Sequence, residues 1–225
     1  GDAGPLRIRV HVAIAGLVVE SSSNATTQIV VRKDSGITDI RQLQGKTVAT
    51  PTAGSVIHVS FLHWLKFSGV DPNSVRAVEV PFPNMGDQLK SGRVDAVQAV
   101  QPFLGQLLGQ GFVGLGSPAL AVSDPALLVF WIAQGAWARQ NATVIAKWTA
   151  SLEQAQVFVS KNGTEARAVL AKYTNLPDAI AQKLPLPSYQ FGLDTRQFDA
   201  WTRVLRDLGQ LSAPLDINKL IVTGK

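Results

Sequence analysis

Residues 45–67 read G-K-T-V-A-T-P-T-A-G-S-V-I-H-V-S-F-L-H-W-L-K-F. The pattern predicts a buried strand over Thr47–Thr50, a tight turn of small residues, and an amphipathic helix after Ser55. Pro51 ends the strand because it cannot donate to a sheet ladder, and Ser55 is a preferred N-cap residue. The first N–H groups of such a helix lack internal partners and lie at the positive end of the helix dipole. The stretch therefore predicts a turn that can hold an anion or a polar group.

Short strands and short helices alternate around this stretch. Apolar patterns predict strands over residues 6–14, 28–31, 75–80, 94–100 and 111–115, and helices over residues 37–43, 84–89 and 102–108, with Thr38 and Asn84 as the N-caps of the first two helices. This order predicts a mainly parallel sheet with helices on both faces. Ligands of such folds bind beyond the carboxyl ends of the strands. We therefore expect the site in the loops after Thr50, Val80 and Val100.

The second half of the chain is mostly helical. An apolar run over residues 126–133 predicts a fully buried strand or a crossing between two lobes. Helical spacing predicts helices over residues 141–159, 164–173, 177–184 and 194–208, with Asp194 as the N-cap of the last. The first of these helices carries an apolar stripe made of Val144, Ile145, Trp148, Leu152, Ala155 and Phe158.

The composition is that of an ordinary globular protein. The 225 residues are 46% hydrophobic and 16% charged, and no apolar run approaches the roughly 20 residues that span a bilayer. The net charge is +5, but the Lys and Arg residues are scattered, which argues against a nucleic-acid partner. The absence of Cys excludes a thiolate zinc site and a cysteine nucleophile. The first residues, G-D-A-G-P-L-R, do not form a signal peptide and look like a mature or trimmed start.

Three motifs together resemble a known family. They are V-V-R-K-D-S-G-I-T-D-I-R-Q-L-Q-G-K-T-V-A-T-P-T-A-G-S at residues 30–55, L-K-F-S-G-V-D-P-N-S-V at 65–75, and L-K-S-G-R-V-D-A-V-Q-A-V-Q-P-F at 89–103. In this order they resemble the periplasmic solute-binding proteins of ABC importers, most closely the nitrate/sulfonate/taurine-binding family, which shares its fold with thiamine-pyrimidine binders. The resemblance covers about residues 28–208. It implies a two-lobed α/β fold of the periplasmic-binding-protein type, with mainly parallel sheets, helices on both faces, and a ligand between the lobes.

The resemblance also implies how the chain divides. Residues 31–126 would form the second lobe, and residues 1–30 with 127–225 would form the first lobe and its C-terminal helices. The first lobe looks incomplete, because about 27 residues precede V-V-R-K-D-S-G and a single βαβ unit needs roughly 30. We expect residues to be missing near Gly16: an implausible step between Ala13 and Val18 would support a gap, and an ordinary loop in a compact lobe would exclude it.

The candidate site combines the turn before the 56–67 helix with polar and aromatic residues at the other strand ends. The candidate ligand-binding residues are Thr52, Gly54, Ser55, Val56, His58, Phe82, Asn84, Gln98, Gln101, Ser22 and Trp131. Ser22 would face the cleft from the other lobe. Most have structural alternatives, namely capping for Ser55, packing for Phe82 and Trp131, and a bond to the backbone for Gln98.

Two candidate positions carry a further qualification. His63 lies five residues after His58 on another helix face, which argues against a zinc site. Gln101 stands where relatives often carry Glu, which weakens any expectation of a ligand amine or cation there.

The resemblance implies the extracytoplasmic binding component of an ABC importer rather than an enzyme. Its partners would be a small anionic or organic ligand and a membrane permease, with no cofactor, no metal and a monomeric state. A sulfonate such as taurine or an alkanesulfonate is the first expectation, with nitrate and a pyrimidine precursor as alternatives. The location would be periplasmic or extracellular, with an optional lipid anchor on a removed N-terminal segment.

Other function classes fit the sequence less well. There is no G-x-S-x-G elbow and no Walker-type loop. Thiamine-pyrimidine synthases of the same fold rely on a cysteine-rich segment, and this chain has no Cys. An effector-sensing domain of a regulator shares the two-lobed plan but would need a DNA-binding helix-turn-helix, which the sequence does not carry.

Overall fold

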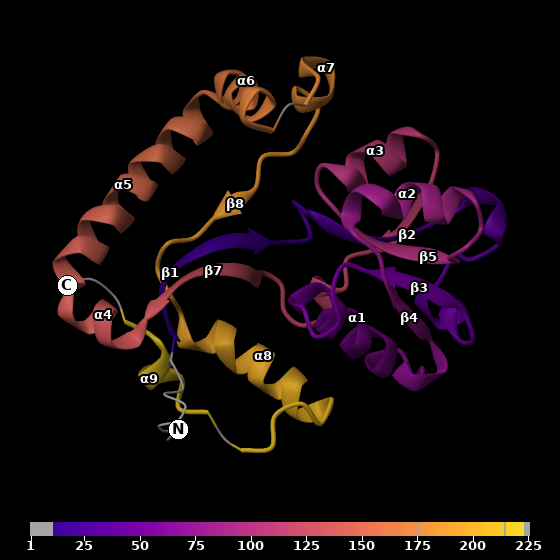
Figure 1. Cartoon of the computed structure of the whole chain (residues 1–225), viewed down its shortest axis with the longest axis horizontal. Helices are drawn as coiled ribbons and strands as arrows, with labels where there is room; N and C mark the ends of the chain where they lie inside the picture. The colour runs from indigo at the N-terminus through magenta and orange to yellow at the C-terminus, as the bar shows by residue number, and fades with distance from the viewer. Residues whose placement is uncertain (1–10, 175, 214, 223–225) are drawn as a thin grey trace, which may run out of the picture.

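The computed structural model describes residues 11–174, 176–213 and 215–222, which build two β-sheets joined by two connecting segments (Figure 1). We call the part built on the five-stranded sheet the second lobe and the part built on the three-stranded sheet the first lobe. The strand order is β4-β3-β5-β2-β6 in the second lobe and β7-β1-β8 in the first. The second-lobe strands are β2 (Thr27–Val31), β3 (Thr47–Thr50), β4 (Arg76–Glu79), β5 (Ala96–Val100) and β6 (Val113–Gly116).

The second-lobe sheet is mainly parallel, as the sequence predicts. Strand β3 runs parallel to both β4 and β5, whereas β2 is antiparallel to its neighbours β5 and β6. The parallel strands are linked through helices, which is the connection that parallel pairing requires. Strand β2 has no such crossover before it, because it brings the chain in from the first lobe.

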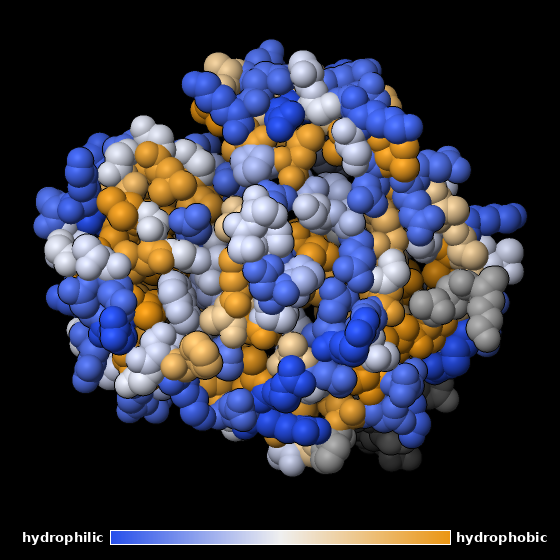
Figure 2. Space-filling model, turned by 180° about the vertical axis from the view of Figure 1, so that it is seen from behind, coloured by the Kyte–Doolittle hydropathy of each residue, from blue (hydrophilic) through white to orange (hydrophobic). Residues whose placement is uncertain are grey.

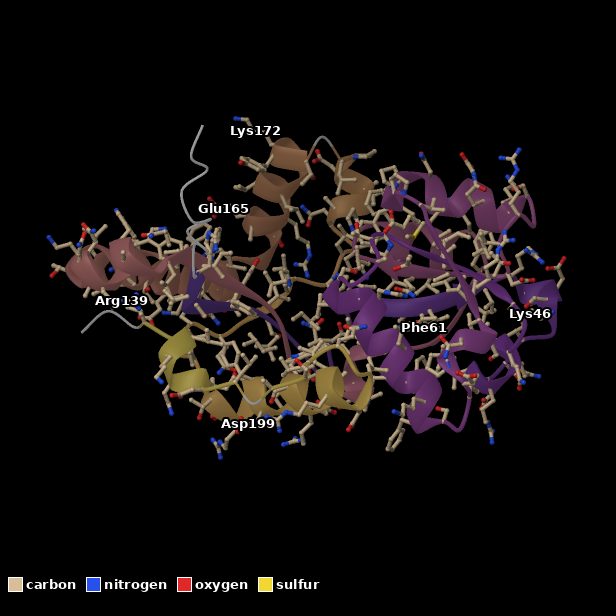
Figure 3. All side chains as sticks on the ribbon, turned by 60° about the horizontal axis from the view of Figure 1, so that its bottom comes forward. Lys46, Phe61, Arg139, Glu165, Lys172 and Asp199 are labelled. Carbon is tan, nitrogen blue, oxygen red and sulfur yellow. The ribbon has the colours of Figure 1, made fainter. Side chains whose placement is uncertain are left out.

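Helices cover both faces of this sheet. Helix α1 (Val56–Phe67) packs on one face, and α2 (Phe82–Lys90) and α3 (Phe103–Gly109) pack on the other. Phe61 points from α1 into the core and is fully buried (Figure 3). The α1 side buries Ile29, Val31, Val48, Phe61, Leu65 and Ala96, among others, and the opposite side buries Val30, Ala49, Met85, Leu89, Val97 and Leu104.

Short 3₁₀ helices and two helix starts differ from the sequence prediction. The second-lobe connections contain η1 (Lys33–Ser35), η2 (Ile40–Leu43), η3 (Pro72–Ser74) and η4 (Ala119–Ala121). The N-cap of η2 is Asp39 rather than Thr38, because Asp39 and Gln42 form a capping box. Asn84 does not cap α2 but lies in its first turn, since Pro83 fits an early helical position and lets the helix begin at Phe82.

The first lobe contains an antiparallel sheet and most of the helices. Strand β1 (His11–Glu20) pairs antiparallel with both β7 (Ala126–Gln134) and β8 (Ser188–Tyr189), so the prediction of a mainly parallel sheet is wrong here. Strands β1 and β7 carry the chain out of and back into the lobe, which makes them run in opposite directions. The helices are α4 (Gly135–Gln140), α5 (Ala142–Lys161), α6 (Gly163–Thr174), α7 (Asp178–Ala181), α8 (Thr195–Asp207) and α9 (Ile217–Leu220).

Strand β1 continues through Gly16, where the sequence suggested missing residues. It has register irregularities between Ala13 and Val19 but neither a break nor a loop. Gly16 is required there, because a Cβ atom would collide with the backbone carbonyl of Gln190. The predicted strand over residues 6–14 is described only from His11, and its earlier part lies outside the described residues.

Several apolar side chains of the first lobe are exposed, contrary to the sequence prediction. Strand β7 buries Ala126–Leu128 but exposes Val129–Ile132, so of the two predicted alternatives it is the crossing back to the first lobe and not a fully buried strand. In α5, which forms as predicted, only Ile145 of the apolar stripe is buried. The view from behind shows hydrophobic areas on the surface of both lobes among hydrophilic side chains (Figure 2).

The sheets also bear on where one lobe ends and the other begins. Residues 27–30 belong to the five-stranded sheet as part of β2, whereas the sequence assigned them to the first lobe. We therefore propose residues 27–125 as the second lobe. The lobes are joined by residues 21–26 and by residues 117–125, the last part of the second lobe, which contain η4; these two segments are called the crossovers below.

Candidate functional site

Three strand ends meet at one edge of the second-lobe sheet. Strands β4, β3 and β5 are adjacent and parallel, with Thr50 opposite Glu79 at their carboxyl ends. The segments that follow them are 51–55, 80–82 and 101–103. Their shared edge brings together the second-lobe candidates predicted from the sequence.

The N-terminus of α1 lies at the centre of this edge. Ser55 caps the helix by accepting a hydrogen bond from the backbone N–H of His58 at 3.3 Å, as predicted. Gly54 has a φ of +75°, a conformation that favours glycine, and it makes the turn into the helix possible. Within the described part of the chain, the N–H groups of Val56 and Ile57 have no hydrogen-bond acceptor. These two donors and the helix dipole remain available to a ligand.

His58 folds back onto the turn instead of pointing away from it. Its Nδ1 accepts a hydrogen bond from the N–H of Gly54 at 3.0 Å, so the neutral ring carries its proton on Nε2. Burial lowers the pKa of His58 below its ordinary value, and the charge of Glu79 acts in the opposite direction. Nε2 is buried and has no partner among the described residues. His58 therefore keeps one N–H donor unused.

Glu79 is a site residue that the sequence analysis missed. As the last residue of β4, it extends to the neighbouring turn, where Oε1 accepts a hydrogen bond from the N–H of Ala53 at 2.7 Å. The pattern of apolar and polar residues along β4 gives no indication that Glu79 makes this contact. Its position at a parallel strand end, beside β3, is the signal that could have identified it.

A buried polar pair lies directly behind the turn. The Thr50 hydroxyl donates to Gln98 Oε1 at 3.1 Å, and both side chains are almost completely buried. Gln98 Nε2 has no hydrogen-bond partner among the described residues. Gln98 Nε2 is therefore a second unused side-chain donor, after His58 Nε2, and leaving a buried amide unpaired is costly.

Aromatic side chains occupy the two outer strand ends. Phe82 at the start of α2 and Phe103 at the start of α3 stack with ring centroids 6.1 Å apart. Gln101 is held by the N–H of Gly105, which donates to its Oε1 at 3.2 Å. Asn84 is exposed on the first turn of α2, and Thr52 is exposed with its hydroxyl donating to Pro51.

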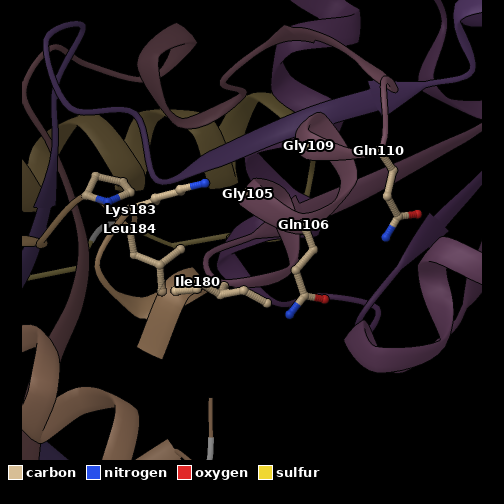
Figure 4. A pocket seen from close by; sticks show the side chains of 9 residues that line it. Gly105, Gln106, Gly109, Gln110, Ile180, Lys183 and Leu184 are labelled. Carbon is tan, nitrogen blue, oxygen red and sulfur yellow. The ribbon is translucent and has the colours of Figure 1, made fainter. Parts of the chain in front are cut away.

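A cavity of about 400 Å³ lies between α3 of the second lobe and the α7 region of the first (Figure 4). Ile180, Lys183 and Leu184 face Gly105 and Gln106 across it. Lys183 forms no salt bridge within the described residues. This volume is within the usual range of small-molecule sites, and its wall at Gly105 adjoins Gln101.

Two candidates are not brought to this edge. The backbone N–H of Ser22 donates to Asp124 at 3.3 Å on the exposed surface of the crossovers. Trp131 packs edge-on against Trp148 of α5, with centroids 5.1 Å apart, and is not among the residues that line the interlobe cavity. An apolar run cannot reveal which face of a strand a Trp occupies, and this explains the difference.

The described residues also bear on metal binding and membrane insertion. No group of three or more His, Asp or Glu side chains suited to a metal ion occurs in the described ranges. His63 lies instead with Nε2 3.2 Å from the carbonyl oxygen of Ala121. None of the described helices is both long and apolar enough to cross a membrane.

Comparisons with known proteins add to this geometry. The family model described as NMT1/THI5 like matches residues 14–165. A protein of Brachyspira hyodysenteriae (strain ATCC 49526 / WA1), provisionally named a periplasmic binding protein of an ABC transporter, is 29% identical over 138 residues. That alignment covers 60% of this chain and only 39% of the relative's length.

Solved structures share the fold at low sequence identity. The aliphatic sulphonate binding protein of Escherichia coli has a TM-score of 0.77 and 18% identity, covering 96% of this chain and 70% of that one. The alkanesulfonate-binding protein of Xanthomonas axonopodis pv. citri, bound to MOPS, has a TM-score of 0.78 and 18% identity, covering 95% and 74%. A desulfurization enzyme also has this fold, with a TM-score of 0.63 and 14% identity. The fold is thus common to binding proteins and an enzyme.

Proposed function

The chain belongs to the NMT1/THI5-like family, and we propose that it is the substrate-binding component of an ABC importer for a small organic sulfonate. The provisionally named relative and the sulfonate-binding proteins of the same fold support this proposal. In this function the chain works outside the cytoplasm, as a monomer, and delivers its ligand to a membrane permease.

The observation that carries the proposal is the pair of open N–H groups at Val56 and Ile57. A sulfonate oxygen accepts hydrogen bonds from such donors without needing a cationic side chain. The stacked rings of Phe82 and Phe103, which follow the neighbouring strands β4 and β5, offer an apolar surface for an organic group. Closure of the two lobes around the ligand then excludes water and presents the closed form to the permease.

A thermal-shift screen tests this function. The probes are taurine, alkanesulfonates of increasing chain length, nitrate, simple carboxylates and thiamine pyrimidine precursors. We expect an alkanesulfonate to raise the melting temperature with a saturable dose response, because a ligand that binds only the folded state stabilises it. A screen in which no sulfonate stabilises the protein would contradict the proposal.

Ser55→Asp separates anion binding from helix capping. Asp is as good an N-cap residue as Ser, so the helix should remain stable, while the added negative charge beside Val56 repels an anion. We expect the sulfonate-induced shift to disappear. Ser151→Asp on the exposed surface of α5 is the matched control and should leave the shift unchanged. A shift that survives Ser55→Asp would show that the anion binds elsewhere.

One observation favours a second candidate, a ligand with N–H donors such as an aminopyrimidine. The Glu79 carboxylate already occupies the N–H of Ala53, and its negative charge suits a donor or a cation better than a sulfonate. In the same screen, a pyrimidine precursor would then stabilise the protein more than any sulfonate. Glu79→Gln would weaken that stabilisation, whereas it would strengthen the binding of an anion.

A further inference from the structure

Glu20 is a buried acid at the place where both crossovers meet. It is the last residue of β1 in the first lobe and lies opposite Ala126, the first residue of β7. Its side chain is fully buried, which is rare for a carboxyl group. The proposed ligand contacts do not use it.

The carboxyl group of Glu20 reaches across to the second lobe. The hydroxyl of Thr27, the first residue of β2, donates to Glu20 Oε2 at 3.0 Å, and the hydroxyl of Thr26 donates to the same oxygen at 3.1 Å. The Ser117 hydroxyl, at the start of the second crossover, lies 3.0 Å from the Thr27 hydroxyl. One carboxyl group therefore connects the end of the first-lobe sheet with the end of the first crossover and, through Thr27, with the start of the second.

Among the residues that the structure describes, no salt bridge involves Glu20. Strands β2, β6 and β7 carry no ionisable side chain, and β8, the other neighbour of β1, carries Tyr189 opposite Val18. The ionisable groups on and against the crossovers are Asp124, which accepts from the N–H of Ser22 at the surface, and His63, which contacts the carbonyl of Ala121. Burial raises the pKa of Glu20, and the hydroxyl hydrogen bonds from Ser117, Thr27 and Thr26 act in the opposite direction.

We propose that Glu20 is a positioning residue that latches the two lobes in one relative orientation, through hydrogen bonds between its carboxyl group and hydroxyl groups of the second lobe. A rotation of the lobes about the crossovers must break these bonds or expose the carboxyl group to water. The hydrogen-bonded arrangement is thus one of two discrete states of the hinge, which is what a lobe movement needs.

The latch has a defined dependence on pH. The buried carboxyl group has a higher pKa than it has in an orientation that exposes it to water, so the latched orientation binds the proton more strongly. The latch is therefore firmest below the ordinary value of 4.5. It weakens as the pH rises through the raised pKa, because the ionised form favours exposure.

Spin-label distance measurements test the latch without any ligand, so the result does not depend on the proposed function. The chain has no Cys, and labels can be placed at exposed positions by Lys90→Cys in the second lobe and Arg139→Cys in the first. We expect a narrow distance distribution that broadens as the pH is raised from 4 to 8. Glu20→Ala should give a broad distribution at every pH, and Glu20→Gln a narrow distribution without the pH response.

Hydrogen exchange of the crossovers gives a second readout. Loss of the hydrogen bonds in Glu20→Ala should speed the exchange of the amides in residues 21–26 and 119–123 by about tenfold. Asp124→Asn removes an exposed carboxylate from the same crossovers and should change neither readout. Unchanged distances and exchange rates in Glu20→Ala would overturn the proposal.

A second variant keeps the test decisive if Glu20→Ala does not fold. Thr27→Val combined with Ser117→Ala retains the acid and nearly the same shape but removes two hydroxyl groups. This variant should also broaden the distance distribution and speed the exchange of the crossovers. If it behaves like the parent protein, Glu20 is not held by the second lobe and the latch does not exist.

Discussion

The two lobes of this chain bury their apolar residues to very different extents. The second lobe holds two buried clusters, one on each face of its sheet, with Phe61, Leu65, Met85 and Leu89 completely or almost completely buried. The first lobe holds smaller clusters, such as the one around Val12, Ala138 and Ile145, and exposes Phe130, Trp131 and Ile132 on its edge strand β7. The second lobe therefore buries most of its large apolar side chains, whereas the first lobe leaves several of them exposed to solvent.

The difference follows from how each sheet is assembled. Strands β3, β4 and β5 follow one another in the sequence. The helices that connect them pack on the same sheet and bury its apolar side chains. Strand β1 instead pairs with β7 and β8, which are more than a hundred residues away in the sequence. Pairing of strands that are far apart in the sequence costs more chain entropy. Helices α4 and α9, which contact β1, also come from the second half of the chain.

The largest expected effect is on the core of the second lobe. Phe61→Ala should destabilise the protein by about 3–5 kcal/mol, because it leaves a large cavity among well-packed residues. Phe130→Ala removes the same atoms from a ring that is 41% exposed and should cost only about 1–2 kcal/mol. Urea denaturation of both variants gives the two values. Equal losses would show that the lobes are packed equally well.

Two neighbouring residues of α5 allow a buried and an exposed side chain of the first lobe to be compared. Ile145 is buried and Val144 is exposed, although both belong to the same predicted apolar stripe. We expect Ile145→Ala to cost about 2–4 kcal/mol and Val144→Ala less than about 0.5 kcal/mol. Thermal denaturation in parallel checks this, and a large loss for Val144→Ala would mean that α5 packs through a different face.

Variants of two helix N-caps should show a smaller difference in stability between the lobes. Ser55 makes a side-chain cap hydrogen bond at the start of α1, whereas Asn141 makes none at the start of α5. Ser55→Ala should therefore cost about 1 kcal/mol, and Asn141→Ala clearly less. Denaturant titration of the two variants is the measurement, and the reverse order would contradict the assigned caps.

The smallest expected effect is electrostatic. Arg41 lowers the pKa of Asp39 to about 2 through side-chain and backbone hydrogen bonds. Because this pKa is below the ordinary value of 3.8, the stabilisation is present above pH 3.8 and is lost as the pH falls towards 2. An NMR titration of the carboxyl group should find no midpoint near 4. A midpoint at the ordinary value would show that the capping box of η2 does not persist in solution.

The sequence predicts the second lobe well because its signals are local. The strand over Thr47–Thr50, the Ser55 cap and the helix after it all form as expected, since each depends on residues a few positions apart. The first lobe is predicted less well. The direction of β1 and the exposure of Val129–Ile132 depend on segments far away in the sequence, and no local pattern carries that information.

The candidate site follows the same rule. Which loops share an edge follows from the βαβ order, and the structure brings the segments after β3, β4 and β5 together. Which donors remain open does not follow from it, because that depends on Glu79 reaching the N–H of Ala53 and on His58 turning back to Gly54. The sequence leaves Trp131 two alternatives, a ligand contact or packing, and the structure packs it against Trp148.

We propose that the open N–H groups at the N-terminus of α1 hold the ligand. Amide chemical shifts recorded during a titration with an alkanesulfonate test it directly. We predict saturable shifts of the Val56 and Ile57 amides, with little change at Ser68 at the other end of the same helix. Saturable shifts confined to the residues around Lys183, or no shift at Val56 and Ile57, would contradict the claim.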